Sequence, residues 1–118
     1  MKSILYVEDN ADTAEAVKII LSSAGFDVTL ANCGKEGLRL AQEKKFDLFL
    51  LDIMLPDMSG WDIFEKLKPK INAKYAFISA IPVSAERIAE LKKSGVSDYI
   101  MKPFTKADLV KRVTKILA

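Results

Sequence analysis

Polar and charged side chains follow four short apolar segments of this chain, at positions where they could act together. They are Glu8 and Asp9 after the first segment, Asp52 after the third, Ser79 at the end of the fourth and Lys102 after the fifth. Carboxylates that converge repel one another unless a cation lies among them. Oxygen ligands without His or Cys are typical of Mg²⁺, which binds one or two carboxylates together with water and phosphate oxygens. The residue types therefore predict a magnesium site and phosphate chemistry.

Asp52 is the best candidate for a nucleophile in this group. It precedes the segment Ile53-Met54-Leu55-Pro56, in which the chain must leave a sheet, so its carboxylate is expected at the tip of a strand. A carboxylate can attack phosphorus to form an acyl phosphate. The transfer depends mainly on positioning and on neutralising the charge of the phosphoryl oxygens. Lys102 and Ser79 offer an ammonium and a hydroxyl group for that purpose.

The composition limits the classes of function that the chain can have. Its 118 residues suit one domain with a single core, and no apolar run approaches the ~20 residues that a membrane span needs. The absence of histidine excludes Ser-His and Cys-His catalysis, His-based zinc sites and a role as phosphohistidine donor. Since the net charge is only +2, we expect no direct nucleic-acid binding. The lone Cys33 and the early acids at positions 8 and 9 indicate a cytoplasmic protein without a secretory signal.

Short apolar runs alternate with amphipathic segments along the whole chain. The predicted strands are Ile4–Val7, Phe26–Ala31, Leu48–Leu51, Tyr75–Ile78 and Tyr99–Met101, and the predicted helices are Ala11–Ala24, Lys35–Lys44, Trp61–Lys68, Ala85–Ser94 and Lys106–Leu117. Gly25 and Gly95 stand where left-handed C-terminal caps would fall, and Ser84 and Thr105 where N-caps would fall. Five βα units in this order predict an α/β protein with a doubly wound parallel five-stranded sheet, whose ligands bind beyond the carboxyl ends of the strands.

The residues at these strand ends resemble the receiver domains of two-component response regulators. The resemblance rests on Leu5–Asp9 (LYVED), Asp52–Gly60 (DIMLPDMSG), Ser79-Ala80 and Asp98–Phe104 (DYIMKPF), all in order and at family-like spacing. It extends from Ile4 to Leu117 and implies one receiver domain over residues 1–118. It also implies the flavodoxin-like strand order 2-1-3-4-5.

The resemblance implies a phosphorylation site with a bound metal ion. Asp52 would be the phospho-acceptor, and Mg²⁺ would be bound by Asp9, Asp52 and the backbone carbonyl of Met54. Glu8 would act on the metal mostly through water. Met54 and Ile81, which flank the phosphoryl group in similar receivers, are both apolar, so we expect slow autodephosphorylation.

The resemblance also implies a switch next to the acceptor. Ser79 matches the switch hydroxyl, Lys102 the lysine that pairs with the phosphoryl group, and Tyr99 the aromatic residue that rotates inward. Ala80 would leave room beside them. Pro103 follows Lys102 where family members commonly have a cis peptide bond, for which proline lowers the penalty.

The implied partners are separate proteins. The phosphoryl donor would be a sensor histidine kinase or a phosphotransfer protein, and an unidentified downstream protein would bind the face formed by the fourth helix, fifth strand and fifth helix. We expect a stand-alone receiver, a monomer or weak homodimer, which assists its own phosphorylation and dephosphorylation but is not otherwise an enzyme. An excised piece of a larger protein is the alternative.

Other functions and simpler interpretations remain open at this point. A haloacid-dehalogenase-like phosphatase would need a second Asp two residues after the nucleophile, where this chain has Met54, and a flavodoxin-like flavin carrier would need a phosphate loop in place of Glu8–Asp12. A receiver that no longer takes phosphate would usually have lost Asp52 or Lys102. Individually, the early acids could be a helix N-terminal pair, Ser79 a loop cap and Tyr99 a core aromatic. The lysines and arginine of the last two helices could be a solvated face.

Overall fold

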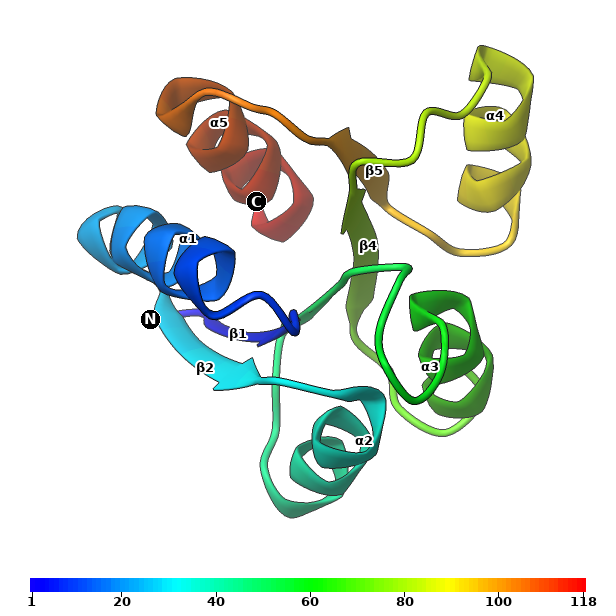
Figure 1. The fold of residues 1–118 in the computed structure, drawn as a ribbon, viewed down its shortest axis with the longest axis horizontal. Helices are drawn as coiled ribbons and strands as arrows, with labels where there is room; N and C mark the ends of the chain where they lie inside the picture. The colour runs from blue at the N-terminus through cyan, green and yellow to red at the C-terminus, as the bar shows by residue number, and fades with distance from the viewer.

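Strands and helices alternate from one end of the chain to the other (Figure 1). The computed structural model describes residues 1–118. The strands are β1 Ser3–Val7, β2 Asp27–Ala31, β3 Leu48–Leu51, β4 Lys74–Ser79 and β5 Asp98–Met101. The helices are α1 Ala11–Ser23, α2 Gly34–Glu43, α3 Gly60–Leu67, α4 Ala85–Lys93 and α5 Lys106–Leu117. All ten predicted elements are present, and their bounds differ from prediction by one residue at several ends.

The five strands form one parallel sheet in the order β2-β1-β3-β4-β5. The predicted α/β doubly wound fold and its strand order 2-1-3-4-5 are therefore confirmed. The central strands are apolar on both faces, as expected where helices cover both sides of a sheet. All four residues of β3 are buried, for example. Two strands begin one residue earlier than predicted, because Ser3 and Asp98 pair with the neighbouring strand through their backbones although their side chains are polar.

Helices cover the two faces of the sheet unequally (Figure 1). Alternate strand residues point to opposite faces, so Tyr6 contributes to a core beneath α1 and α5, while Leu5 contributes to a core beneath α2, α3 and α4. The second of these cores contains most of the aromatic pairs, such as Phe49 stacked on Tyr75 with ring centroids 5.1 Å apart. The two helical layers pack against both faces of the sheet and so fix the positions of the strand ends.

The ends of the helices carry the capping residues that the sequence predicts. Gly25 and Gly95 adopt positive φ values of 96° and 106°, and the Ser84 and Thr105 side chains accept hydrogen bonds from backbone N–H groups in the first turns of α4 and α5. Cys33 occupies the N-cap position of α2. None of the five helices is long and apolar enough to cross a membrane.

Candidate functional site

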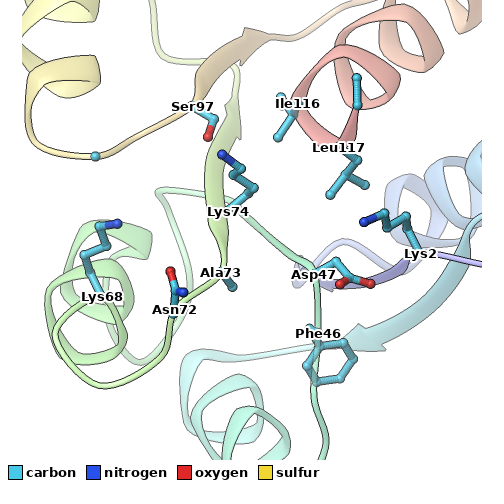
Figure 2. Close-up of a pocket in the computed structure, with 12 residues that line it drawn as sticks. Lys2, Phe46, Asp47, Lys68, Asn72, Ala73, Lys74, Ser97, Ile116 and Leu117 are labelled. Atoms are coloured by element: carbon cyan, nitrogen blue, oxygen red, sulfur yellow. The ribbon is translucent and has the colours of Figure 1, made fainter.

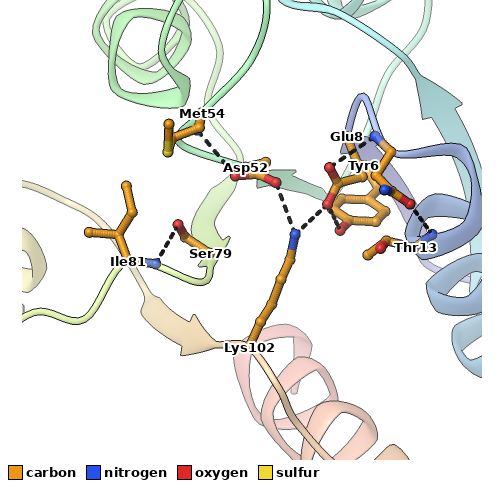
Figure 3. A network of polar contacts seen from close by, with 9 residues as sticks. Tyr6, Glu8, Thr13, Asp52, Met54, Ser79, Ile81 and Lys102 are labelled. Atoms are coloured by element: carbon orange, nitrogen blue, oxygen red, sulfur yellow. Dashed lines mark hydrogen bonds and ion pairs between the residues drawn. The ribbon is translucent and has the colours of Figure 1, made fainter.

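The carboxyl ends of four parallel strands meet at one edge of the sheet and bring the predicted residues together (Figure 3). The carboxylates of Glu8, Asp9 and Asp52 each have an oxygen within 4.8 Å of the others. Lys102, which follows β5, reaches across the edge to the same cluster and donates hydrogen bonds to Asp52 at 2.9 Å and to Glu8 at 2.5 Å. These four residues come from three strand ends that are far apart in the sequence, so the parallel sheet assembles the cluster.

Asp52 is fixed by its backbone. Its N–H group donates to the carbonyl of Val7 at 3.1 Å and so extends the β1–β3 pairing by one residue. The chain then turns away, and the first residue of α3, Gly60, folds back against the strand end. A Cβ atom at Gly60 would lie 2.1 Å from the backbone oxygen of Asp52, so only glycine allows this approach. The predicted helix begins one residue later, at Trp61, and the sequence does not indicate this contact of Gly60 with the candidate nucleophile.

Lys102 is held at its own strand end. Its N–H group donates to the carbonyl of Ser79 at 2.9 Å, and its peptide bond to Pro103 is cis, the isomer that the resemblance leads us to expect. The side chain is 21% exposed, whereas those of Glu8 and Asp52 are 2% and 9% exposed. The ammonium group thus bridges two nearly buried carboxylates while keeping some contact with solvent.

Burial and the ion pairs act against each other on the acid–base properties of the cluster. The pKa of Asp52 is raised, mainly because burial disfavours its charged form and also because Glu8 is near, although Lys102 opposes both effects. The pKa of Glu8 is lowered, because hydrogen bonds, above all the one from Lys102, outweigh the opposing effect of burial. The pKa of Lys102 is raised, since its two carboxylate partners outweigh its own burial. Of these two carboxylates, Asp52 is therefore the one whose charged form the site disfavours.

The cluster suits a hard divalent cation. Three carboxylates carry three negative charges when ionised and Lys102 carries one positive charge, so two negative charges remain to be balanced. Every available side-chain ligand atom is a carboxylate oxygen, which is the donor set of Mg²⁺ or Ca²⁺ rather than of zinc. Asp9 is exposed and accessible to an ion, and the backbone of Met54 lies beside Asp52, to which its N–H group donates at 3.1 Å. The residues present thus fit a magnesium ion.

Ser79 lies beside this cluster (Figure 3), and Tyr99 is joined to Ser79 through Ile81. The N–H group of Ile81 donates to the Ser79 hydroxyl oxygen at 3.1 Å, and the Tyr99 hydroxyl donates to the Ile81 carbonyl at 2.6 Å. Both side chains are buried, Ser79 to 1% and Tyr99 to 3% exposure. The Ser79 hydrogen bond matches the loop-capping interpretation, yet it uses only an acceptor lone pair and leaves the hydroxyl proton free to be donated. Ala80, the next residue, is exposed.

A hollow lies at the opposite edge of the sheet, where the strands begin (Figure 2). It has a volume of about 500 Å³, and its lining includes Lys2, Asp47, Lys68, Lys74 and Ser97. The Asp47 carboxylate already accepts hydrogen bonds from the backbone and side chain of Ser3. The only cluster of potential metal ligands is the one at the carboxyl ends. The two edges are separated by the length of the strands, so the hollow does not belong to the candidate site.

Two further contacts at the site were not predicted from the sequence. The hydroxyl group of Tyr6 in β1 donates to Glu8 at 2.9 Å. The alternation of side chains along a strand places positions 6 and 8 on one face, and that pattern is the only available signal. Asp57 accepts hydrogen bonds from the N–H groups of Gly34 and Lys35, both at 2.8 Å, and so fixes the loop after Asp52 to the start of α2.

Comparison with known proteins gives the same class as the fold and the site. Residues 4–114 match the response regulator receiver domain. The cell cycle transcriptional regulator CtrA of Caulobacter vibrioides is 36% identical over 97% of this chain and 49% of its own length. The transcriptional regulatory protein CusR of Escherichia coli is 39% identical over 97% of this chain and 50% of its own length. This chain therefore spans about half the length of the curated relatives that it matches.

Solved structures are similar over nearly the whole chain. A receiver domain protein of Methanospirillum hungatei, described as CheY-like, has a TM-score of 0.87 and 33% identity, covering 99% of this chain and 94% of that one. The response regulator protein TrrA of Thermotoga maritima, in complex with Mg²⁺-BeF, has a TM-score of 0.84 and 30% identity, covering 99% and 100%. The fold and the acidic edge define a receiver of a two-component system. This chain belongs to the response regulator receiver domain family.

Proposed function

We propose that this chain is a phosphorylation-dependent signalling switch that accepts a phosphoryl group on Asp52. The observation that carries the proposal is the position of the Asp52 carboxylate. It lies at the tip of β3, beside Glu8 and Asp9 and in an ion pair with Lys102. A nearly buried carboxylate surrounded by an ammonium group and further acids suits nucleophilic attack on a phosphoryl group whose charge is neutralised locally.

The donor would be a phosphohistidine of a sensor histidine kinase or a phosphotransfer protein. An Asp52 carboxylate oxygen attacks the phosphorus atom, a new O–P bond forms, and the N–P bond of the donor breaks. The electron pair of that bond stays on the imidazole nitrogen, which takes a proton from water. Lys102 would pair with one phosphoryl oxygen and the Ser79 hydroxyl would donate to another, which stabilises the charge during transfer.

Asp9, Asp52 and the backbone carbonyl of Met54 would hold Mg²⁺, with Glu8 acting mostly through water. When bound, the ion would neutralise charge on the phosphoryl oxygens. Two observations support this assignment. The cluster carries two negative charges in excess of Lys102, and the similar TrrA structure of Thermotoga maritima was solved in complex with Mg²⁺-BeF.

Phosphorylation would be read out through Ser79 and Tyr99. Because both are tied to Ile81, a movement of the Ser79 hydroxyl toward a phosphoryl oxygen would disturb the loop that leads into α4. Ala80 is exposed and would leave space for that movement. The expected result is a shift of a pre-existing equilibrium at the face formed by α4, β5 and α5, where a downstream protein would bind.

Several features of the whole protein stay predictions. Residues 1–118 would be one receiver domain, acting in the cytoplasm as a monomer or weak homodimer and without direct nucleic-acid contact. A receiver that acts alone is our first expectation, and a receiver beside another domain is the alternative, since the matched relatives are about twice as long. In either case we expect a switch that assists its own modification rather than an enzyme acting on other substrates.

The proposal is tested by intact-mass spectrometry after incubation with acetyl phosphate, with and without Mg²⁺. We expect one phosphoryl adduct on the wild type that depends on Mg²⁺ and is absent from Asp52→Asn. The variant Asp12→Asn, which changes an exposed acid outside the cluster, should be labelled like the wild type. If no adduct forms under any condition, the chain is better explained as a binding module that does not take phosphate. If Asp52→Asn is still labelled, the acceptor is another residue.

A further inference from the structure

Tyr6 is an unusual residue for the position that it occupies. It lies in the middle of the sheet in β1, its side chain is fully buried among apolar residues of the core beneath α1 and α5, and it ends in a polar group. Position 8 follows on the same face, so the Tyr6 ring points along the strand toward the Glu8 carboxylate (Figure 3). Burial, and then the nearby Glu8 charge, raises the pKa of Tyr6 far above its usual range, so the phenol stays protonated and acts as a hydrogen-bond donor.

Both carboxylate oxygens of Glu8 are occupied by donors from this chain. Oε1 accepts from the Tyr6 hydroxyl at 2.9 Å and from the Lys102 ammonium, and Oε2 accepts from the backbone N–H of Asn10 at 3.2 Å. The Glu8 side chain is only 2% exposed. Its orientation is therefore set from below by Tyr6 and from the loop by Asn10. Lys102 therefore donates to a Glu8 carboxylate that two other hydrogen bonds hold in one orientation.

A continuous chain of hydrogen bonds thus leads from the core to the candidate nucleophile. Tyr6 donates to Glu8, Lys102 donates to the same oxygen of Glu8, and Lys102 also donates to Asp52 at 2.9 Å. The ammonium group has a long, flexible stem and loses conformational entropy when it is fixed. A preoriented Glu8 reduces the number of positions that this ammonium group can take beside Asp52.

We propose that Tyr6 is a positioning residue. It holds the Glu8 carboxylate in one orientation as a hydrogen-bond acceptor for Lys102, and this acceptor keeps the lysine beside Asp52. The consequence for phosphoryl transfer rests on the proposed function, whereas the positioning of Lys102 does not. The simpler alternative is that Tyr6 only fills the core. In that case phenylalanine, which keeps the ring and removes the hydroxyl group, would serve equally well.

The test compares Tyr6→Phe with a matched control, Tyr75→Phe, in the full chain. Tyr75 is also a buried strand tyrosine, 1% exposed, and its hydroxyl donates to the Ile71 carbonyl at 2.8 Å, away from the carboxylate cluster. At saturating acetyl phosphate and Mg²⁺, we expect Tyr6→Phe to lower the phosphorylation rate on the order of tenfold, the usual scale for loss of a group that orients a site residue. Tyr75→Phe should keep the wild-type rate. Equal rates in all three proteins would overturn the proposal.

A second readout does not depend on phosphorylation. In ¹⁵N-lysine-labelled protein, the Lys102 ammonium protons should be protected from exchange with water while Glu8 and Asp52 hold them. We expect this protected signal in the wild type and in Tyr75→Phe, and its loss or broadening in Tyr6→Phe, with backbone amide spectra confirming that each variant is folded. An unchanged Lys102 signal in a folded Tyr6→Phe variant contradicts the positioning role, even if the wild type proves not to accept phosphate.

A double-mutant cycle asks whether Tyr6 acts through Glu8. Glu8→Gln removes the negative charge that pairs with the Lys102 ammonium group while keeping the shape of the side chain. If Tyr6 acts only through that carboxylate, adding Tyr6→Phe to Glu8→Gln should change the rate less than twofold, far below its effect in the wild type. Fully additive losses would show that Tyr6 acts by another route and would overturn the proposal.

Discussion

Met54 shows how a single residue at the site affects the expected lifetime of the signal. It follows Asp52 by two positions, and its side chain is 68% exposed at the mouth of the site. Ile81, the other residue expected beside the phosphoryl group, is also apolar, and its backbone groups are already bonded to Ser79 and Tyr99. Neither side chain offers a hydrogen bond that would orient a water molecule for attack on phosphorus.

We therefore expect slow autodephosphorylation in the wild type and faster loss of phosphate in Met54→Asn. One hydrogen bond worth about 1.4 kcal/mol to the attacking water would accelerate the reaction roughly tenfold. The measurement is the decay of the phosphoryl adduct by intact mass after removal of the donor. Ile19→Asn, which changes a similarly exposed apolar residue on α1, is the control and should decay like the wild type. A wild type that loses phosphate as fast as Met54→Asn would contradict this expectation.

At the scale of elements, the site depends on loops that are tied to neighbouring helices. Asp57 lies in the segment between β3 and α3, and its carboxylate accepts the first N–H groups of α2 from Gly34 and Lys35. A carboxylate at a helix N-terminus satisfies donors that have no partner within the helix. These hydrogen bonds, from Lys35 above all, lower the pKa of Asp57. The loop that follows the candidate nucleophile is thereby anchored to another layer of the fold.

The sign of the linked pH effect follows from the lowered pKa. Asp57 stabilises the folded state above the pKa of an unfolded-state Asp, about 3.9, and this contribution is lost as the pH falls through the lower pKa of the folded state. We expect Asp57→Ala to melt at a lower temperature than the wild type at pH 7, with the gap closing in strong acid. Thermal melts at a series of pH values provide the measurement. A gap for Asp57→Ala that persists unchanged into acid would contradict the capping role.

For the molecule as a whole, the fold concentrates negative charge at one edge of the sheet, although the net charge of the chain is small. The chain carries a net charge of +2, yet three carboxylates lie within 4.8 Å of one another at one edge with a single ammonium group as counter-charge. Repulsion of this kind costs folding free energy, and a bound cation removes it. The stability of the whole domain should therefore respond to Mg²⁺.

We expect Mg²⁺ to raise the melting temperature at constant ionic strength. A ligand that binds only the folded state contributes about 2.7 kcal/mol when its concentration is one hundred times its Kd. Differential scanning fluorimetry across a Mg²⁺ titration, with KCl to match ionic strength, measures the effect. Asp9→Asn should weaken the response, whereas Asp12→Asn should not. A melting temperature that does not change with Mg²⁺ would argue against a metal at this edge.

The amino-acid sequence was sufficient to predict the ten elements and the chemistry of the strand ends. The alternation of apolar runs with amphipathic segments sufficed for ten elements, because burial on both faces of a parallel sheet requires continuous apolar strands. Polar residues directly after such strands could be grouped in advance, since parallel strands share one carboxyl edge. In this way Glu8, Asp52 and Lys102 were predicted to converge, and the structure places them in hydrogen-bond contact.

The pairing of groups within that cluster could be read only from the three-dimensional structure. Lys102 bridges Glu8 and Asp52, and Gly60 lies against the Asp52 backbone. Both contacts depend on distances of a few ångströms between separate elements. Spacing along the chain indicates that Tyr6 and Glu8 share one face of β1, but it carries no information on the contacts between separate elements, which the twist of the sheet and the packing of its helices set. Residue patterns specify which strand ends meet, and close packing of the whole molecule specifies which atoms touch.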